Sequence, residues 1–138
     1  MQWMILPYRR YFDFSGRSRR MEYWMFVLFN LAVSVVISAV FGVQEVQRNG
    51  WMVGFDSRLT GVGGLVQNLF GLVSFIPGMA VSIRRLHDQD RSGWLMLLLL
   101  IPFFGWFALL VLMMLSGTDG TNRFGQDPKK PYDASAFD

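Results

Sequence analysis

Long apolar runs without any charged residue alternate with short charged segments along this chain of 138 residues. Such runs cover residues 24–43, 62–83 and 94–115, and none of them contains Asp, Glu, Lys or Arg. A helix of about 20 apolar residues crosses the hydrocarbon core of a bilayer, which is about 30 Å thick. The pattern therefore predicts an all-α membrane protein with three transmembrane helices over these runs.

The third run is dense in leucine and phenylalanine, but Pro102 and Gly105 interrupt it near its middle. Proline removes a backbone donor and clashes with the preceding turn, so we expect a kink there. The alternative is a re-entrant segment that turns back over residues 101–105. A crossing places the C-terminal tail outside, whereas a re-entrant segment returns the tail to the side of the N-terminus.

The N-terminal segment, residues 1–14, mixes aromatic residues with Arg9, Arg10 and Asp13 and is too short to cross a bilayer. Such a mixture suits an amphipathic segment lying in the headgroup layer, and a disordered start is the alternative. Ser18 is a suitable N-cap, and Glu22 then falls in the first helical turn, where a carboxylate is favourable. The first long helix is expected to begin there.

These elements divide the chain into a membrane domain, residues 1–115, and a polar tail, residues 116–138. The tail is rich in Gly, Asp, Lys and Pro and begins as a turn-forming segment. We expect its last several residues to be loosely ordered. The segment from 44 to 60 is a polar loop of balanced charge between the first two spans.

The composition supports a membrane location: 52% of the residues are hydrophobic and only 17% are charged. Without cysteine, the chain has neither disulfides nor thiolate metal ligands. The pI of about 9.7 does not indicate nucleic acid, because the basic residues form short clusters beside apolar runs. That arrangement is typical of topology signals and of contact with anionic lipid.

The distribution of basic residues predicts the orientation. Five arginines precede the first span, and the loop after it has only Arg48 and Arg58. Cytoplasmic segments carry the excess of Lys and Arg. We therefore expect the N-terminus and the charged strip 84–91 on the cytoplasmic side.

Small and polar residues form a stripe on each of the first two predicted spans. Such residues mark the faces through which membrane helices pack, because they allow close approach and hydrogen bonding. Antiparallel counting places Ser34 near Ser74 and Ser38 near Asn68, and it predicts that exchanging Gly71 for leucine harms folding. The alternative is that small residues are simply common in membrane helices. The predicted packing residues are Ser34, Ser38, Gly64, Asn68, Gly71, Ser74 and Gly78.

His87 and Asp88 are the only place where a general base could be argued. Adjacent helical residues do not face each other, however, and no nucleophile motif accompanies them. We expect His87, Asp88 and Asp90 to pair with three arginines of the same strip, Arg84, Arg85 and Arg91. We expect no enzyme activity. One histidine with carboxylates in a turn is also no diagnostic metal ligand set. Catalytic, cofactor-binding and metal-binding residues are therefore not predicted.

The arginines support a binding hypothesis. Those before the first span and those after the second would converge at one headgroup level if the two helices pack together. Guanidinium groups favour planar oxyanions such as phosphate, although arginines can also serve only to set topology. The predicted site for anionic lipid or a partner is a basic platform of Arg17, Arg19, Arg20, Arg84 and Arg85, braced by His87 and Asp88.

Three motifs in this order resemble a known family. They are residues 14–24 (Phe-Ser-Gly-Arg-Ser-Arg-Arg-Met-Glu-Tyr-Trp), residues 84–94 with Arg-Arg-Leu-His-Asp and Arg-Ser-Gly-Trp, and residues 122–128 with Asn-Arg-Phe-Gly and Asp-Pro. The chain resembles domain-of-unknown-function family 805, the YhaH/YhaI-like small inner-membrane proteins of bacteria. The resemblance implies a polytopic protein of the bacterial inner membrane with no established activity. The loop 44–61 is longer than is usual in that family.

Two functions follow from the sequence. The first is a non-enzymatic binding or assembly role, in which the basic cytoplasmic face recognises anionic lipid or a membrane protein partner. The second is a small transporter or channel subunit working as a homo-oligomer, with Gln67, Asn68 and the kink at Pro77 lining a polar path.

Overall fold

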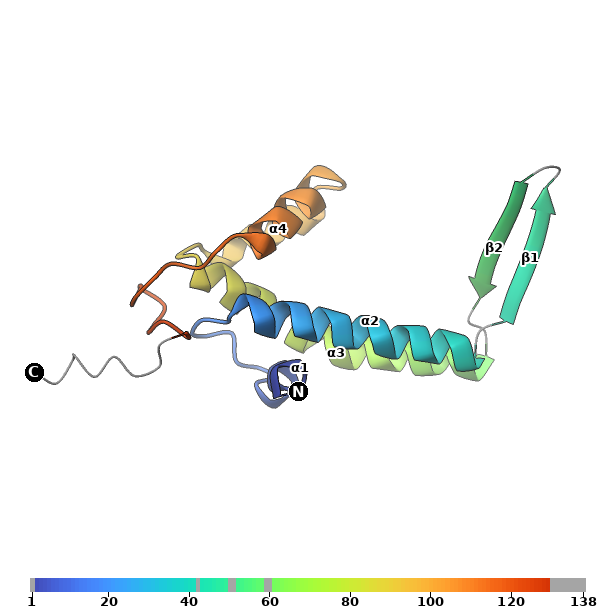
Figure 1. Cartoon of the computed structure of the whole chain (residues 1–138), viewed down its shortest axis with the longest axis horizontal. Coiled ribbons are helices and arrows are strands. Elements are labelled where there is room, and N and C mark those ends of the chain that lie inside the picture. Colours follow the sequence, from blue (N-terminus) through green and yellow to red (C-terminus); the bar gives the residue numbers. More distant parts are fainter. Residues whose placement is uncertain (1, 42, 50–51, 59–60, 130–138) are drawn as a thin grey trace, which may run out of the picture. The chain divides into compact units, whose positions relative to one another are not determined.

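The computed structural model describes residues 2–41, 43–49, 52–58 and 61–129 (Figure 1). The predicted loosely ordered end of the tail lies outside these residues. The chain divides into two compact units, Met1–Phe26 with Ile76–Asp138, and Val27–Phe75. Its elements are α1 (Gln2–Arg9), α2 (Arg20–Phe41), β1 (Val43–Asn49), β2 (Met52–Arg58), α3 (Gly61–Asp88), the 3-10 helix η1 (Gly93–Leu100) and α4 (Phe104–Met114).

Helices α2 and α3 correspond to the first two predicted spans. Helix α2 has 22 residues and α3 has 28, and both are long and apolar enough to cross a membrane. At about 1.5 Å per residue they extend for about 33 and 42 Å, against an apolar core of about 30 Å. Helix α3 contains the whole of the predicted span 62–83 and adds the turn that ends at Asp88.

The long helices expose their apolar side chains instead of burying them. Only 11% of the most apolar stretch of α2 and 17% of that of α3 is buried. Val40 is 67% exposed and Leu72 is 71% exposed. The core helix of a water-soluble protein would hide such side chains, whereas a bilayer covers them without cost. The predicted all-α membrane fold is confirmed in class.

The loop between α2 and α3 forms a two-stranded antiparallel ribbon that the sequence did not predict (Figure 1). Its register runs from the pair Val43 and Arg58 to the pair Asn49 and Met52. The helical class of the membrane domain is unaffected, because this ribbon belongs to the polar loop.

The third apolar run is not one continuous helix, which corrects the single span predicted over 94–115. Figure 1 shows that the chain reverses between η1 and α4. The reversal follows Leu100, where Ile101 takes an extended conformation, and it includes Phe103 at φ 60. The turn lies at the position that the re-entrant alternative named.

Helical geometry and close packing explain the reversal. The arms have 8 and 11 residues, so each extends for only about 16 Å. A Cβ atom placed on Gly105 would lie 1.8 Å from the carbonyl oxygen of Leu98, which shows how closely the arms approach. The indole N–H of Trp106 also donates to the carbonyl of Leu99 at 3.1 Å. We call this pair of arms the helical hairpin.

Within the unit Val27–Phe75, α2 and α3 are joined by a hydrogen bond from Gln67 Nε2 to Ser34 Oγ at 3.1 Å. The partner of Ser34 is therefore about two helical turns from the predicted Ser74. Asn68 and Gly71 lie on an exposed face of α3, which corrects the predicted contact of Asn68 with Ser38.

Gly71 does not contribute a close helix contact either. Among the residues that the structure describes, a Cβ atom on Gly71 would meet nothing within 4 Å, so no close contact supports the predicted harm from exchanging it for leucine. Of the other small residues in the stripe, Gly64 is half-buried. Gly78 belongs to the other unit, where an added Cβ would make an ordinary contact with Phe26 at 3.6 Å.

The N-terminal segment forms helix α1, which packs on the beginning of α2. The ring of Tyr8 lies 5.2 Å from that of Phe26. The guanidinium of Arg19 lies 5.4 Å from the ring of Trp3, a distance suitable for a cation–π interaction. The predicted amphipathic segment is thus a short helix held by aromatic contacts.

A small apolar core connects the helical hairpin to the end of α3. Its buried members are Leu86, Leu109 and Met113, and Tyr23 and Trp24 of α2 pack against them. Helix α3 then ends in a Schellman arrangement, in which the N–H of Arg91 donates to the carbonyl of Leu86 at 3.0 Å and Asp90 adopts φ 57. This core fixes the place where the charged segments meet.

Candidate functional site

Three segments that are far apart in the sequence meet at the C-terminal end of α3. The N–H of Ser18, just before α2, donates to the carbonyl of Arg84 at 3.1 Å. The N–H of Thr118, in the tail, donates to the carbonyl of Asp88 at 2.8 Å. The last carbonyls of a helix lack intrahelical partners, so the tail completes the hydrogen bonding of α3.

Asp88 lies at the centre of this site and is 2% exposed. Arg17 Nε donates to its Oδ1 at 3.0 Å, and Arg85 donates to its Oδ2. The backbone of Gly117 lies against the same carboxylate, because a Cβ atom added there would be 2.0 Å from Oδ2. One buried anion therefore binds two buried cations from different segments.

Arg17 also ties the tail to the segment before α2. Its guanidinium donates to the carbonyls of Thr118 and Gly120 and approaches that of Gly125 at 3.4 Å. The planar group has five N–H donors, and the tail wraps around it through backbone carbonyls. The tail thus belongs to the site and is positioned by a buried side chain.

Arg85 performs the corresponding role for the helical hairpin. It donates to the carbonyl of Leu115 and lies 3.5 Å from that of Met113, while Gln89 donates to the carbonyl of Leu112. A cation at a helix C-terminus satisfies the last carbonyls and is favoured by the helix dipole. Arg85 therefore fixes the end of α4 against the end of α3.

A second buried ion pair joins α2 to α3. Arg84 NH2 lies 3.2 Å from Glu22 Oε1, and both side chains are almost fully buried. The Nε and NH1 atoms of Arg84 have no hydrogen-bond partner among the described residues. Glu22, predicted to favour the helix dipole, also balances a buried arginine.

The predicted basic platform requires correction. Arg17, Arg84 and Arg85 do converge with the N-terminal segment, but all three are buried and face Asp88, Glu22 and backbone carbonyls. Buried charges are stable only when they are paired, so these groups are internal structural elements. Of the predicted platform, Arg20 is exposed and Arg19 is partly exposed.

His87 contributes an aromatic contact and does not pair with Asp88. Its ring is stacked on Phe124 with centroids 3.8 Å apart and planes at 3°, and its Nδ1 lies 3.3 Å from the carbonyl oxygen of Gly16. Asn122 Nδ2 donates to the carbonyl of His87 at 2.9 Å. The carboxylate of Asp88 is occupied by two arginines, so it does not orient the imidazole.

In the charged strip 84–91, the predicted pairing is correct for Asp88 with Arg85. Asp90 pairs instead with Arg123 of the tail, at 3.1 Å. Among the residues that the structure describes, no three His, Asp or Glu side chains gather into a metal ligand set.

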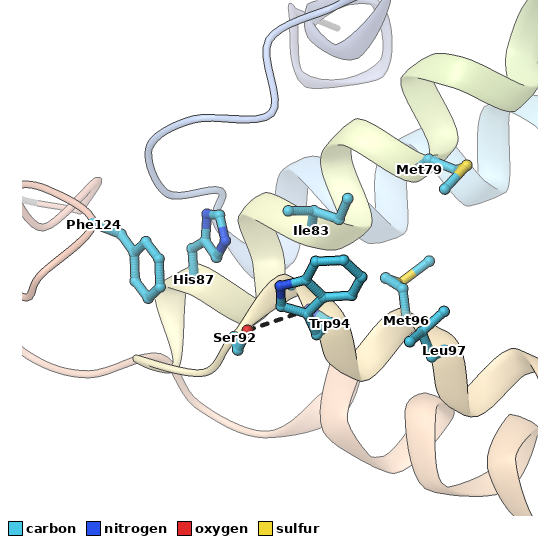
Figure 2. A pocket seen from close by; sticks show the side chains of 9 residues that line it. Met79, Ile83, His87, Ser92, Trp94, Met96, Leu97 and Phe124 are labelled. Atoms are coloured by element: carbon cyan, nitrogen blue, oxygen red, sulfur yellow. Dashed lines mark hydrogen bonds between the residues drawn. The ribbon is translucent and has the colours of Figure 1, made fainter.

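An apolar cavity of about 520 Å³ lies beside the ion pairs (Figure 2). It is bounded by the C-terminal part of α3, by η1 and by Phe124 of the tail. Its polar lining residues are His87 and Ser92, and the remaining lining residues are Met79, Ile83, Gly93, Trp94, Met96, Leu97 and Phe124. Ligand pockets commonly measure about 300–1,000 Å³.

Several cations remain exposed around this end of the molecule. Arg9, Arg20 and Arg91 are exposed and form no ion pair within the described part of the chain. Arg20 makes one long hydrogen bond to the carbonyl of Met114, at 3.4 Å. These cations, unlike the buried ones, are available to an external anion.

Two carboxylates hold the surface turns near the site. Hydrogen bonding by the hydroxyl of Ser15 lowers the pKa of Asp13 to about 2, with a further contribution from Arg10. The backbone N–H of Lys129 lowers the pKa of Asp127 below its ordinary value. Both groups are therefore ionised at neutral pH and keep their turns closed.

Sequence reasoning missed the tail residues of the site. Thr118, Asn122 and Phe124 bind α3 or stack on it, although residues 122–125 entered the sequence analysis only as part of a family motif. A usable signal was the turn chemistry of 117–125, which allows backbone carbonyls to converge. Glu22, the buried partner of Arg84, could have been found because it is a charged residue in the first turn of an otherwise apolar helix.

Comparisons with known proteins identify the family of this chain. Inner membrane protein YhaH of Escherichia coli is 42% identical over 129 residues, which cover 94% of this chain and 98% of YhaH. Inner membrane protein YhaI of the same organism is 41% identical over 129 residues, which cover 94% of this chain and 97% of YhaI. No solved structure matches the chain. The family described as Protein of unknown function (DUF805) matches residues 11–126, a range that includes the long helices, the helical hairpin and the segments that meet at Asp88. The chain therefore belongs to the DUF805 family.

Proposed function

We propose that this membrane protein has a non-enzymatic binding role and holds anionic phospholipid at its cytoplasmic end. The observation that carries this proposal is a set of exposed arginines, Arg9, Arg20 and Arg91, that form no ion pair with any residue the structure describes. Arg20 begins α2, just after the segment that binds the end of α3, Arg91 directly follows the end of α3, and Arg9 ends α1. An anionic phosphate is the group that guanidinium binds best.

The buried ion pairs leave the exposed arginines as the main positive charge that faces outward. Arg17, Arg84 and Arg85 are buried and paired with Asp88 and Glu22, so most of their charge is balanced internally and they contribute less field outside than exposed arginines do. An arginine near an anionic membrane surface contributes about 1 kcal/mol of attraction. The exposed cations therefore carry the preference for anionic headgroups.

The proposal places the N-terminus, the end of α3 and the tail on the cytoplasmic side. It is supported by the hydrogen bonds of Ser18 and Thr118 to the last turn of α3 and by the helical hairpin, whose arms are too short to cross. The excess of basic residues in these segments agrees with the general rule for cytoplasmic loops. The ribbon between α2 and α3 is then outside.

The absence of cysteine from the chain permits a direct test of topology. Single-cysteine variants Phe12→Cys, Gly50→Cys and Thr121→Cys are labelled with a membrane-impermeant maleimide in right-side-out and inverted vesicles. Positions 12 and 121 are expected to react only in inverted vesicles, and position 50 only in right-side-out ones. Reaction of position 121 in right-side-out vesicles would mean that the third run crosses the membrane.

The lipid preference is tested on the full-length protein purified in detergent with a mixture of phosphatidylglycerol and phosphatidylcholine. Retained lipid is counted by mass spectrometry. The parent is expected to retain phosphatidylglycerol in excess, and the triple variant Arg9→Gln/Arg20→Gln/Arg91→Gln to lose most of that excess. The effect should weaken with salt, because exposed charges are screened within about 10 Å at 0.1 M.

The matched control neutralises charge in the loop after α2, with Arg48→Gln/Arg58→Gln. It should retain phosphatidylglycerol as the parent does. Equal retention of both lipids by the parent, or an equal loss in the control, would remove the proposed function.

A transporter or channel subunit is the second candidate, and the placement of Asn68 favours it. Gln67 is bound to Ser34 and Pro77 is buried, whereas Asn68 is exposed within the predicted span. A polar side chain there is costly unless water or a second copy satisfies it. In the labelling experiment, Asn68→Cys should react in a water-filled path and remain unlabelled in a binding protein.

A further inference from the structure

The cavity beside the ion pairs has an apolar body and one polar end. In Figure 2 the side chains of Met79, Ile83, Trp94 and Met96 surround its apolar part. Methionine side chains are unbranched and adapt to flexible ligands. The walls come mainly from α3 and η1, two apolar helices of the membrane domain. Lipid is the most abundant molecule around such helices and can therefore enter the cavity.

The polar end is formed by His87 and Ser92. Since a carbonyl oxygen only accepts, the contact between His87 Nδ1 and the carbonyl of Gly16 requires a proton on Nδ1. Ser92 Oγ accepts from the N–H of Trp94 at 3.3 Å. Polar groups at one end of an apolar cavity orient an amphipathic ligand, with its apolar part against the methionines.

At the junction of α3 and η1, the backbone of the turn closely approaches the side chains that bound the cavity. A Cβ atom on Gly93 would lie 2.9 Å from Ile83 Cγ2 and 3.4 Å from His87 Nε2. A larger residue would therefore project into the space between these side chains. Glycine at this position allows the turn to approach α3 while the cavity remains open.

Two arginines directly precede residues that line the cavity. Arg91 precedes Ser92 in the chain, is exposed and forms no ion pair among the described residues. The guanidinium of Arg123 lies 4.7 Å from the centre of the Phe124 ring, and this ring lines the cavity. Arg123 also pairs with Asp90, but its side chain is 60% exposed. A phosphate at this end would meet positive charge.

We propose that this cavity is a specific lipid site that takes one acyl chain of an anionic phospholipid, with the phosphate held by Arg91 and Arg123. This inference rests on the proposed preference for anionic lipid and adds the place and stoichiometry of binding. The chemistry that recognises the ligand is an apolar slot joined to a cationic rim. A lipid bound in this slot is distinct from the general lipid layer around the helices.

The test uses the full-length protein, stripped of lipid in detergent and titrated with dioleoyl phosphatidylglycerol or dioleoyl phosphatidylcholine. Native mass spectrometry counts the bound molecules. The parent should hold one phosphatidylglycerol per chain. Met79→Trp fills the cavity and should lower that affinity at least about tenfold, the change that about 1.4 kcal/mol produces. The matched control is Leu72→Trp, which places the same side chain on an exposed position of α3 away from the cavity and should bind as the parent does.

A second variant separates binding of the acyl chain in the cavity from binding of the phosphate by the arginines. Arg91→Gln/Arg123→Gln should still hold one lipid but should lose its preference for phosphatidylglycerol over phosphatidylcholine. If Met79→Trp binds like the parent, or if Leu72→Trp loses as much affinity, the cavity is not the site. If the parent binds one acyl chain in the cavity but prefers neither headgroup, the proposed preference for anionic lipid fails. The cavity would still be the site of the acyl chain.

A fluorescence measurement leaves every cavity residue unchanged in the variant that reports on the cavity. A variant that keeps only Trp94 is compared with one that keeps only Trp106, with the other tryptophans changed to phenylalanine. Phosphatidylglycerol with brominated chains should quench Trp94 in a saturable way at low mole fraction. Trp106 does not line the cavity, and its quenching should rise in proportion to the bulk lipid. Proportional quenching of both would overturn the inference.

Discussion

Replacing Asp88 by asparagine is expected to prevent the protein from accumulating in a folded form. The substitution preserves size but removes the negative charge that forms ion pairs with Arg17 and Arg85, and both arginine side chains are almost fully buried. Breaking a buried ion pair by removing one partner costs about 3–5 kcal/mol. Since protein stability is about 5–15 kcal/mol in total, this loss is a large part of it.

The measurement is the yield of monodisperse protein in detergent and its melting temperature. The matched control is Asp90→Asn, two residues away, whose pair with Arg123 is exposed at both side chains and contributes only about 0–1 kcal/mol. It should behave like the parent. If Asp88→Asn melts as Asp90→Asn does, the buried ion pairs do not hold the three segments together.

Replacing Gly105 by alanine is expected to open the helical hairpin. The added methyl would lie 1.8 Å from the carbonyl oxygen of Leu98 and 3.1 Å from Ile101 Cβ. Because the first obstacle is a backbone atom, a side-chain rotation cannot relieve it. Inserting a methyl into a closely packed site costs about 1–3 kcal/mol and occasionally more, and we expect the upper end of this range.

The control for this variant is Gly71→Ala on the exposed face of α3, where an added Cβ meets no atom of the described part of the chain within 4 Å. Alanine favours a helix over glycine by about 1 kcal/mol, so Gly71→Ala should melt at or above the temperature of the parent. A loss of melting temperature that is equal in both variants would contradict the close approach of the two arms. Leu109 and Met113 lie on the displaced arm, so Gly105→Ala should also disturb the core at Leu86.

The long helices were predictable because their signal is local. Each residue of the runs 24–43 and 62–83 contributes its own transfer free energy, and the sum decides whether the segment enters lipid. The start of α2 at Arg20 follows from neighbouring residues in the same way. The predicted cap is wrong, because the buried hydroxyl of Ser18 has no hydrogen-bond partner among the described residues. The two-stranded ribbon was not predicted, because the loop residues carry no clear alternation.

The third run shows where local reasoning stops. Its composition alone would support a full span, and Pro102 and Gly105 predict only a disturbance near its middle. Whether the chain kinks or reverses depends on what packs against α4. In the structure, Leu109 and Met113 find a place beside Leu86, and Arg85 and Gln89 bind the carbonyls at the end of α4.

The sequence by itself determined that this protein lies in a membrane and that its arginines gather at the ends of two apolar helices. Only the tertiary structure decided which arginines are internal, because burial depends on the distance to Asp88 and Glu22, which lie 71 and 62 residues from Arg17 and Arg84 respectively. It also decided that the tail completes the site. Hydrophobic transfer is a sum over single residues, whereas the pairing of buried charges depends on three-dimensional positions that no local pattern specifies.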